Sequence, residues 1–255
     1  MVMDSSGALY STTAFGGANG LGTMYKIDKK KNQTVLHSFT GGSDGQDPNA
    51  SVVLGSDGNL YSTSANGANV FGTAFKETPA GAFSVFYQFQ GGTHASFPGP
   101  LIVTPNAFYG PASGGAPFNA GVIYRLDQSG ETDLYRFVGG ADGSSGRALV
   151  RDNAGNLYGT GGGGDLACRA PQGCGVVFKL DAKSNYSVLH VFVGPDGVYP
   201  GGLALDPEGN LYGTTTAGGT QNSWTVFKLT PGRAADYHLY VYGGRRWRTA
   251  EWSNS

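Results

Sequence analysis

The sequence predicts an all-β fold made of five similar units, on three observations. An apolar residue followed by tyrosine returns five times, and successive tyrosines lie 51, 48, 49 and 54 residues apart, a spacing typical of a structural repeat. Each unit holds four short runs rich in β-branched and aromatic residues, bounded by Gly, Pro, Asp or Asn, which indicates strands. Four antiparallel strands fill about fifty residues and cannot bury both faces alone, so the units must stack. The five pairs are Leu9-Tyr10, Leu60-Tyr61, Phe108-Tyr109, Leu157-Tyr158 and Leu211-Tyr212.

The fold class that follows is a five-bladed β-propeller with four antiparallel strands in each blade. We expect one domain, closed on itself, because no linker interrupts the repeat. The first strand of each blade is expected nearest the axis. The predicted blades cover residues 1–47, 48–97, 98–146, 147–200 and 201–244, followed by a C-terminal tail at 245–255 that matches nothing upstream.

The strands are expected in the same order in every unit. In the first unit, strands are predicted at residues 1–3, 23–27 and 34–39. In the fifth unit, the four strands are predicted at residues 203–205, 210–215, 225–229 and 237–242. The third unit is the most divergent, and the fourth carries an insertion, because Tyr158 lies 20 residues before Phe178 whereas Tyr212 lies 15 before Phe227.

A short turn joins the first two strands of a unit and has a recurrent Asp-x-x-Gly-Asn composition, as in Asp206 to Asn210. Asp and Asn bond to nearby backbone in such turns, and Gly supplies a positive φ. The apolar residue and the tyrosine that follow point to opposite faces of their strand. We therefore expect each pair to be buried between two neighbouring blades.

Composition narrows the classes of partner. Glycine accounts for 44 of 255 residues and charged residues for 14%, with a net charge of −1 and a pI near 6.4. Nucleic acids and anionic membranes need a concentrated basic field, so neither is expected as a partner. No apolar run is long enough to span a bilayer. We expect a monomer.

Cys168 and Cys174 are the only cysteines, and both lie in the insertion of the fourth unit. Their spacing does not match the paired CxxC sets of structural zinc sites. We predict a local disulfide, which is typical of an oxidising compartment. The expected location is therefore extracellular or periplasmic, although no signal peptide precedes Met1 in this sequence.

The run LALDPEGNLYGTT, the later GVVFKL and the motif VLHVF resemble the GloVer (Gloeo/Verruco) tandem-repeat family, whose members are expected to form propellers. This resemblance covers nearly the whole chain and implies no particular activity. The shorter run GLALDPEGNLY is similar to NHL-type blades and to propeller lactonases of the gluconolactonase and paraoxonase kind. That likeness implies calcium in the central channel, without ligands that match one by one.

Candidate functional residues are polar residues that break the repeat or lie on the longer loops, which all emerge at one end of the strands. Carboxylates from several blades could hold a hard cation such as Ca²⁺, and Asp44, Asp142 and Asp196 are the predicted ligands. The same aspartates could instead cap their own G-x-D-G turns, and both interpretations remain open. Neither G-x-S-x-G nor HExxH occurs, which disfavours serine hydrolases and zincins.

Two functions are carried forward. In the first, Ca²⁺ polarises the carbonyl of a small ester or lactone at the channel mouth, and His94 or Asp47 takes a proton from water. In the second, the protein is a non-catalytic module that binds a glycan or a protein through exposed aromatic side chains. The residues proposed to contact substrate or ligand are Phe97, Tyr199, Trp224 and Asp165, with Phe118 added for the binding module.

Overall fold

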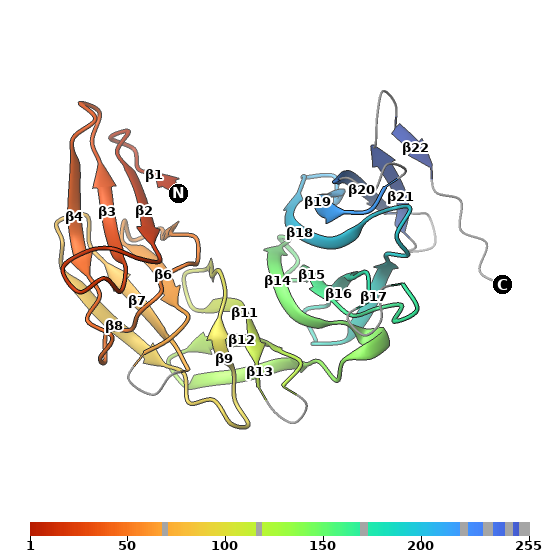
Figure 1. Ribbon diagram of the computed structural model, residues 1–255, viewed down its shortest axis with the longest axis horizontal. Coiled ribbons are helices and arrows are strands. Elements are labelled where there is room, and N and C mark those ends of the chain that lie inside the picture. Colours follow the sequence, from red (N-terminus) through yellow and green to blue (C-terminus); the bar gives the residue numbers. More distant parts are fainter. Residues whose placement is uncertain are drawn as a thin grey trace. The chain divides into compact units, whose positions relative to one another are not determined.

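A computed structural model describes residues 1–67, 71–115, 119–168, 173–219 and 224–231, together with the backbone of residues 237–242 and 247–249. The chain divides into two compact units, Met1–Arg136 and Phe137–Ser255. Both are built from antiparallel sheets (Figure 1). Among the described residues, the sole helical element is a 3-10 turn at Gly140–Asp142. The all-β prediction is confirmed, whereas closure of five blades into a ring stays a prediction.

The first unit holds three sheets, each with its strands hydrogen-bonded in chain order. The third sheet has an additional short strand, β9, which pairs with β11. The strands are β1 (Val2–Met3), β2 (Leu9–Thr13), β3 (Thr23–Ile27) and β4 (Gln33–Ser38); β5 (Val53–Leu54), β6 (Leu60–Ser64), β7 (Thr73–Glu77) and β8 (Phe83–Gln88); and β9 (Ser96–Pro98), β10 (Ile102–Val103), β11 (Phe108–Gly114), β12 (Val122–Asp127) and β13 (Gly130–Arg136).

The second unit holds two sheets of the same pattern. The tail expected to match nothing upstream supplies a fifth strand, β22, which pairs with β21. The strands are β14 (Ser144–Arg151), β15 (Leu157–Gly162), β16 (Val176–Leu180) and β17 (Tyr186–Val191), then β18 (Val198–Leu205), β19 (Leu211–Ala217), β20 (Thr225–Pro231), β21 (Tyr237–Tyr242) and β22 (Trp247–Thr249).

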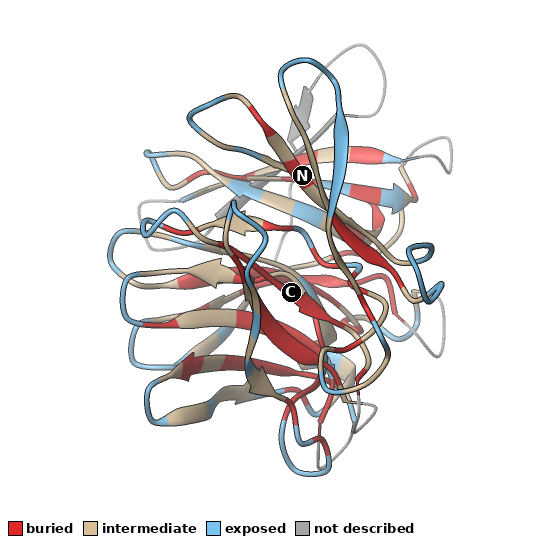
Figure 2. Ribbon diagram, turned by 90° about the vertical axis from the view of Figure 1, so that its left-hand side faces the viewer, coloured by how far each residue is buried: buried red, intermediate tan, exposed pale blue. Residues whose placement is uncertain are grey.

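The recurrent apolar-Tyr pair packs as its alternation predicts. Tyr10 of the first sheet and Leu60 of the second belong to one buried cluster, and Tyr158 and Leu211 share another in the second unit. Tyr10 and Tyr158 therefore face the following sheet, and Leu60 and Leu211 face the preceding one. Figure 2 shows the buried residues within the strands and most of the exposed ones at the turns.

The short turns explain why tyrosine recurs. Asp206 accepts a hydrogen bond from the backbone N–H of Asn210 on Oδ1 and another from the Tyr212 hydroxyl on Oδ2, at 2.8 and 3.1 Å. These bonds fix the turn and hold the tyrosine ring in place. The same contact from tyrosine to the turn aspartate recurs in Tyr10–Asp4, Tyr61–Asp57 and Tyr158–Asp152.

Candidate functional site

Three side chains that could hold a metal ion gather between the second and third sheets. His94 lies in the loop that leads from β8 to β9, while Glu131 and Asp133 lie on β13. One potential ligand atom from each residue falls within 4.8 Å of the other two. Among the described residues, no other group of three His, Cys, Asp or Glu side chains lies this close together. We call it the His94 cluster.

Glu131 is the buried centre of the His94 cluster, with 2% of its side chain exposed. Oε1 accepts a hydrogen bond from the backbone N–H of Ala95, and Oε2 accepts one from the Tyr87 hydroxyl, both at 2.9 Å. Burial raises the pKa of Glu131, and the nearby Asp133 carboxyl adds to the rise, although the two hydrogen bonds oppose it. His94 Nδ1 lies 4.0 Å from Oε1, on an imidazole that is 52% exposed.

Asp133 presents an oxygen that makes no hydrogen bond. Oδ2 accepts one from Nε of Arg136 at 2.7 Å, but Oδ1 is buried without a partner, in a side chain that is 9% exposed. The buried hydroxyl of Tyr124 also lacks a partner, but it lies over Gly110 on β11, on the opposite side of β12 from β13. Because buried polar atoms usually find a partner, the unpartnered Oδ1 of Asp133 is unusual.

The His94 cluster coincides with three departures from the repeat. His94 takes the place of the loop residues Asp44, Asp142 and Asp196. By ladder register, Glu131 takes the place of Phe83 and Tyr186. The register of the same ladders puts Asp133 where the first, second and fourth sheets have Val35, Val85 and Val188.

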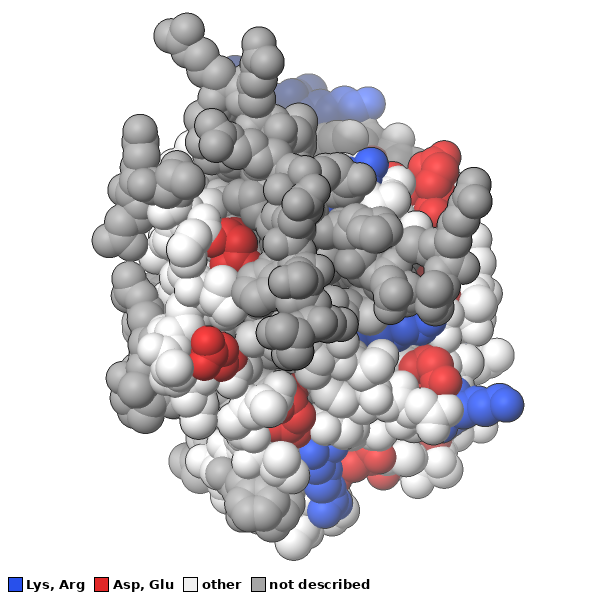
Figure 3. Space-filling view, turned by 90° about the vertical axis from the view of Figure 1, so that its right-hand side faces the viewer, with Lys and Arg blue, Asp and Glu red and all other residues white. Residues whose placement is uncertain are grey.

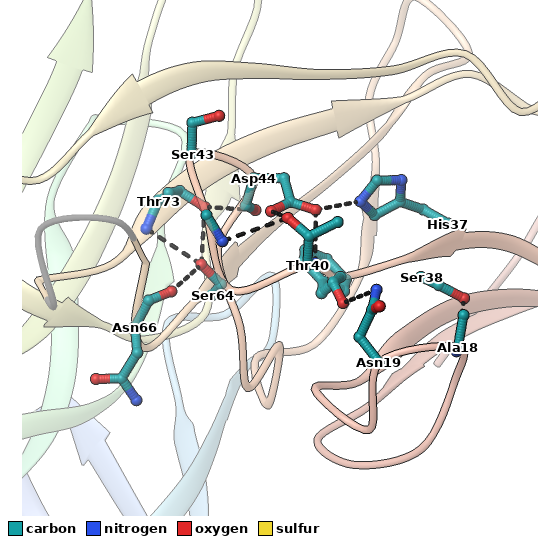
Figure 4. A network of polar contacts seen from close by, with 12 residues as sticks. Ala18, Asn19, His37, Ser38, Thr40, Ser43, Asp44, Ser64, Asn66 and Thr73 are labelled. Atoms are coloured by element: carbon teal, nitrogen blue, oxygen red, sulfur yellow. Dashed lines mark hydrogen bonds and ion pairs between the residues drawn. The ribbon is translucent and has the colours of Figure 1, made fainter.

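The structure places the predicted ligand Asp44 in a network with its own loop and strand β4 (Figure 4). Oδ2 accepts the backbone N–H of Thr40 at 2.9 Å and lies 3.0 Å from His37 Nε2, and Oδ1 accepts the Thr40 hydroxyl at 2.5 Å. Burial works to raise the pKa of Asp44, but the bonds from Thr40 and His37 outweigh it and hold the pKa below its ordinary value.

The other two predicted ligands lie in the second unit and make similar bonds. Asp142 Oδ2 accepts the backbone N–H of Val138 at 2.9 Å. Asp196 Oδ1 accepts that of Val193 at 2.9 Å, while Oδ2 lies 2.8 Å from Nε2 of His190. Each of the three aspartates therefore caps its own loop, and none of them belongs to the His94 cluster.

The predicted residues Asp47, Phe97 and Tyr199 occupy one equivalent position, directly before a proline in the segment that crosses from one sheet to the next. All three have left-handed backbone, with φ of 53°, 55° and 57°. The backbone N–H of Phe97 bonds to the Phe71 carbonyl at 2.9 Å, which ties the crossing segment to the preceding sheet. Pro98 then lies against Gly72, where an added Cβ would come within 2.5 Å of its ring.

Side chains at this position have different surroundings. Asp47 Oδ2 accepts a hydrogen bond from the Asn66 amide at 3.1 Å. Phe97 is 40% exposed. The Arg147 guanidinium lies 5.9 Å from the centre of the Tyr199 ring.

The remaining predicted residues lie elsewhere in the second unit or outside the described residues. Trp224 is exposed. Asp165 accepts the backbone N–H of Ala167 at 2.9 Å and caps the loop that contains Cys168. The predicted disulfide is confirmed, because Cys168 and Cys174 are bonded with their Cα atoms 5.5 Å apart. Phe118 lies outside the described residues.

A groove of about 780 Å³ lies between the short turns of the second and third sheets. Its apolar wall is a group of three aromatic rings, in which Phe108 lies 4.6 Å from Phe86 and 5.0 Å from Tyr61 between ring centres. Asp57, Asn106 and Asp127 add polar groups around this wall. We call it the aromatic groove.

Sequence reasoning found His94 but missed Glu131 and Asp133. Both are on a strand, where alternating polar residues normally indicate a solvent-facing side. The run GETDLYR therefore did not indicate a buried site. A signal was present, since valine stands at the position of Asp133 in three other repeats. Finding it requires alignment of the fourth strands, which are shifted by a β-bulge in each of these sheets.

Comparison with known proteins identifies the repeat. Residues 1–165 and 63–251 match the Gloeobacter/Verrucomicrobia repeat. The chain belongs to the Gloeobacter/Verrucomicrobia repeat family. The search of curated proteins found no match.

Solved structures of lactonase-type propellers are similar in fold to this repeat protein. A gluconolactonase from Xanthomonas campestris has a TM-score of 0.51 and 15% identity, over 92% of this chain and 83% of that one. An unconfirmed gluconolactonase has a TM-score of 0.53 and 14% sequence identity, over 95% of this chain and 91% of that one. An unconfirmed 6-phosphogluconolactonase from Bacteroides uniformis has a TM-score of 0.52 and 12% sequence identity, over 95% of this chain and 80% of that one. Identities this low establish likeness of fold alone.

Two further observations concern partners. Among the described residues, no helix has the length and apolar character that crossing a membrane requires. On the face drawn in Figure 3, acidic and basic side chains lie interspersed among uncharged residues.

Proposed function

We propose that this protein hydrolyses a small ester or lactone with the assistance of a divalent cation, and that the reaction centre is the His94 cluster. The observation that carries the proposal is the exposed His94 imidazole beside two buried carboxylates, one of which has an oxygen without a partner. The likeness in fold to gluconolactonases supports the choice of substrate class.

Each residue of the His94 cluster can have a separate role in hydrolysis. The His94 imidazole and the Asp133 carboxylate are the two groups able to accept a proton from the attacking water. Glu131, held by Tyr87 and Ala95, presents a second carboxyl group beside them. A divalent cation bound there would polarise the carbonyl oxygen. Since Asp44, Asp142 and Asp196 already cap their own loops, we do not assign them to this centre.

The test is hydrolysis of a panel of sugar lactones, simple lactones and aryl esters, with and without a chelator. We expect chelator-sensitive turnover, and a loss of kcat/KM of at least about 100-fold in His94→Ala and in Asp133→Asn. Asp28→Asn is the control, because Asp28 lies in an exposed turn of the same unit. Turnover that survives both substitutions would refute the assignment of the centre.

The aromatic groove favours a second candidate function, the binding of a glycan without turnover. Sugar rings stack on aromatic faces and form hydrogen bonds to surrounding polar groups, and Phe86, which is 37% exposed, presents such a face beside Asp57 and Asp127. A glycan array followed by titration of retained sugars tests it. Phe86→Leu, which installs the residue at the equivalent position in β4, should abolish retention. Equal retention by the variant would exclude the groove.

A further inference from the structure

We propose that His94, Glu131 and Asp133 bind a divalent ion of the transition series, such as Zn²⁺, rather than Ca²⁺. The proposal deepens the proposed function as far as turnover is concerned, but the binding of the ion does not depend on it. Three residues that each depart from the repeat meet at one place, one from the loop before β9 and two from β13.

The kinds of ligand atom determine which ion fits. The cluster offers one imidazole nitrogen and carboxylate oxygens. Imidazole and carboxylate together suit Zn²⁺ and its neighbours. Calcium ions instead take six to eight oxygen ligands, and an imidazole contributes none. The cluster therefore differs from the all-oxygen Ca²⁺ site that the sequence predicts.

The surrounding bonds hold two of the three ligands in place before an ion arrives. Glu131 is fixed by Tyr87 and by the Ala95 backbone, yet each of its oxygens keeps a second lone pair. Asp133 is oriented by Arg136 through Oδ2, which leaves Oδ1 unused. Such outer contacts are typical of metal centres, where they orient the ligands.

The third ligand can move the required distance. Two atoms bound at about 2.1 Å to one tetrahedral ion lie about 3.4 Å apart. The gap from His94 Nδ1 to Glu131 Oε1 is 4.0 Å, and the whole cluster spans up to 4.8 Å. The cluster must therefore contract by up to about 1.4 Å to reach tetrahedral spacing, and His94, half exposed on a loop, is the ligand with most freedom to move.

Three protein ligands leave at least one position open on a four-coordinate ion, which is the arrangement of catalytic zinc sites. With the His94 imidazole bound to the ion, the proton acceptor is no longer His94. Water on the ion, with its pKa lowered to about 7, would then be the nucleophile. This distinguishes a ligand role for His94 from the role of a base.

The experiment is calorimetric titration of the full chain with Zn²⁺ alone and with Ca²⁺ alone, supported by the visible spectrum of added Co²⁺. Each variant removes one ligand. His94→Ala removes the imidazole, and Asp133→Val removes the carboxylate by installing the residue of Val85. Asp133→Asn serves as a second variant if Asp133→Val does not fold, and Asp28→Asn is the matched control.

We expect one Zn²⁺ per chain in the parent and in Asp28→Asn, with binding weakened at least about 100-fold in the cluster variants. Tyr87→Phe, which removes a contact to a ligand, should weaken binding by about 10- to 100-fold. The proposal is overturned if the parent binds Zn²⁺ no more tightly than Ca²⁺, or if folded cluster variants bind like the parent. Tight Zn²⁺ binding without hydrolysis would refute the proposed function and leave this inference standing.

Discussion

The hydroxyl of Tyr87 on β8 donates a hydrogen bond to Glu131 Oε2 on β13, at 2.9 Å, and so joins the second sheet to the third. In the first and fourth sheets, the equivalent residues His37 and His190 instead contact an aspartate of the loop that follows them. Where the loop carries His94 in place of that aspartate, the carboxylate comes from the neighbouring sheet. The carboxylate partner of this ring is thus a loop aspartate in the first and fourth sheets and Glu131 in the second.

Replacing Tyr87 by Phe should lower the free energy of unfolding by about 1 to 3 kcal/mol. Removal of the hydroxyl leaves the buried Glu131 carboxyl with one donor fewer, and a buried group that loses its partner bears the desolvation cost. Urea unfolding of the metal-free protein measures the change. Tyr212→Phe is the control, because its partner Asp206 is part-exposed and water can replace the lost donor. An equal loss of unfolding free energy in the two variants would show that the burial of Glu131 does not strengthen the effect of the lost hydrogen bond.

The strands and their packing could be predicted from sequence because each depends on local pattern. The Leu-Tyr pairs and the Asp turns repeat at fixed offsets, and their burial follows from alternation. The His94 cluster could not be predicted in full, because Glu131 meets His94 only when the loop before β9 packs against β13, a contact between residues far apart in the sequence. The caps made by Asp44 and Asp196 were an open alternative, since a G-x-D-G turn fits both capping and metal binding.

Glu77 is a second departure from the repeat. It lies opposite Leu60 in the β6–β7 ladder, where the other sheets have Ile27, Leu126, Leu180 and Leu229. Its side chain is fully buried and neither carboxylate oxygen has a hydrogen-bond partner. Burial raises the pKa of Glu77 from 4.5 to about 7. The ionised form is therefore disfavoured in the folded protein.

Glu77→Leu should stabilise the protein at pH 8 by about 3 kcal/mol, since one pKa unit corresponds to about 1.4 kcal/mol. The folded state holds the proton more tightly, so the parent loses stability as pH rises from 4.5 to about 7. Below pH 4.5 the charge effect should vanish. Unfolding at pH 4, 6 and 8 measures it, with Glu77→Gln to isolate the charge and exposed Glu208→Gln as control. A pH-independent difference would contradict this account.

Reduction of the Cys168–Cys174 disulfide should cost about 2 kcal/mol or less, because the two residues are six apart and a small loop constrains few unfolded states. Cys174 is fully buried beside Val198 and Phe192, so the thiol should remain packed. Hydrogen exchange with and without reductant should show faster exchange near residues 163–175 alone. Loss of cooperative unfolding on reduction would contradict a local role.

The three sequence-predicted calcium ligands can be tested with Asp44→Asn, Asp142→Asn and Asp196→Asn. If they hold Ca²⁺, the ion should raise the melting temperature of the parent by mass action, and each variant should weaken that response. The structure gives each aspartate a backbone N–H to cap, and an amide retains one acceptor oxygen. We therefore expect each variant to melt lower by the equivalent of about 1 kcal/mol, with an unchanged response to Ca²⁺. For Asp44, whose pKa is lowered, the parent's advantage should be present above pH 3.8 and fade as pH falls further. A calcium response lost in all three variants would restore the sequence-based site.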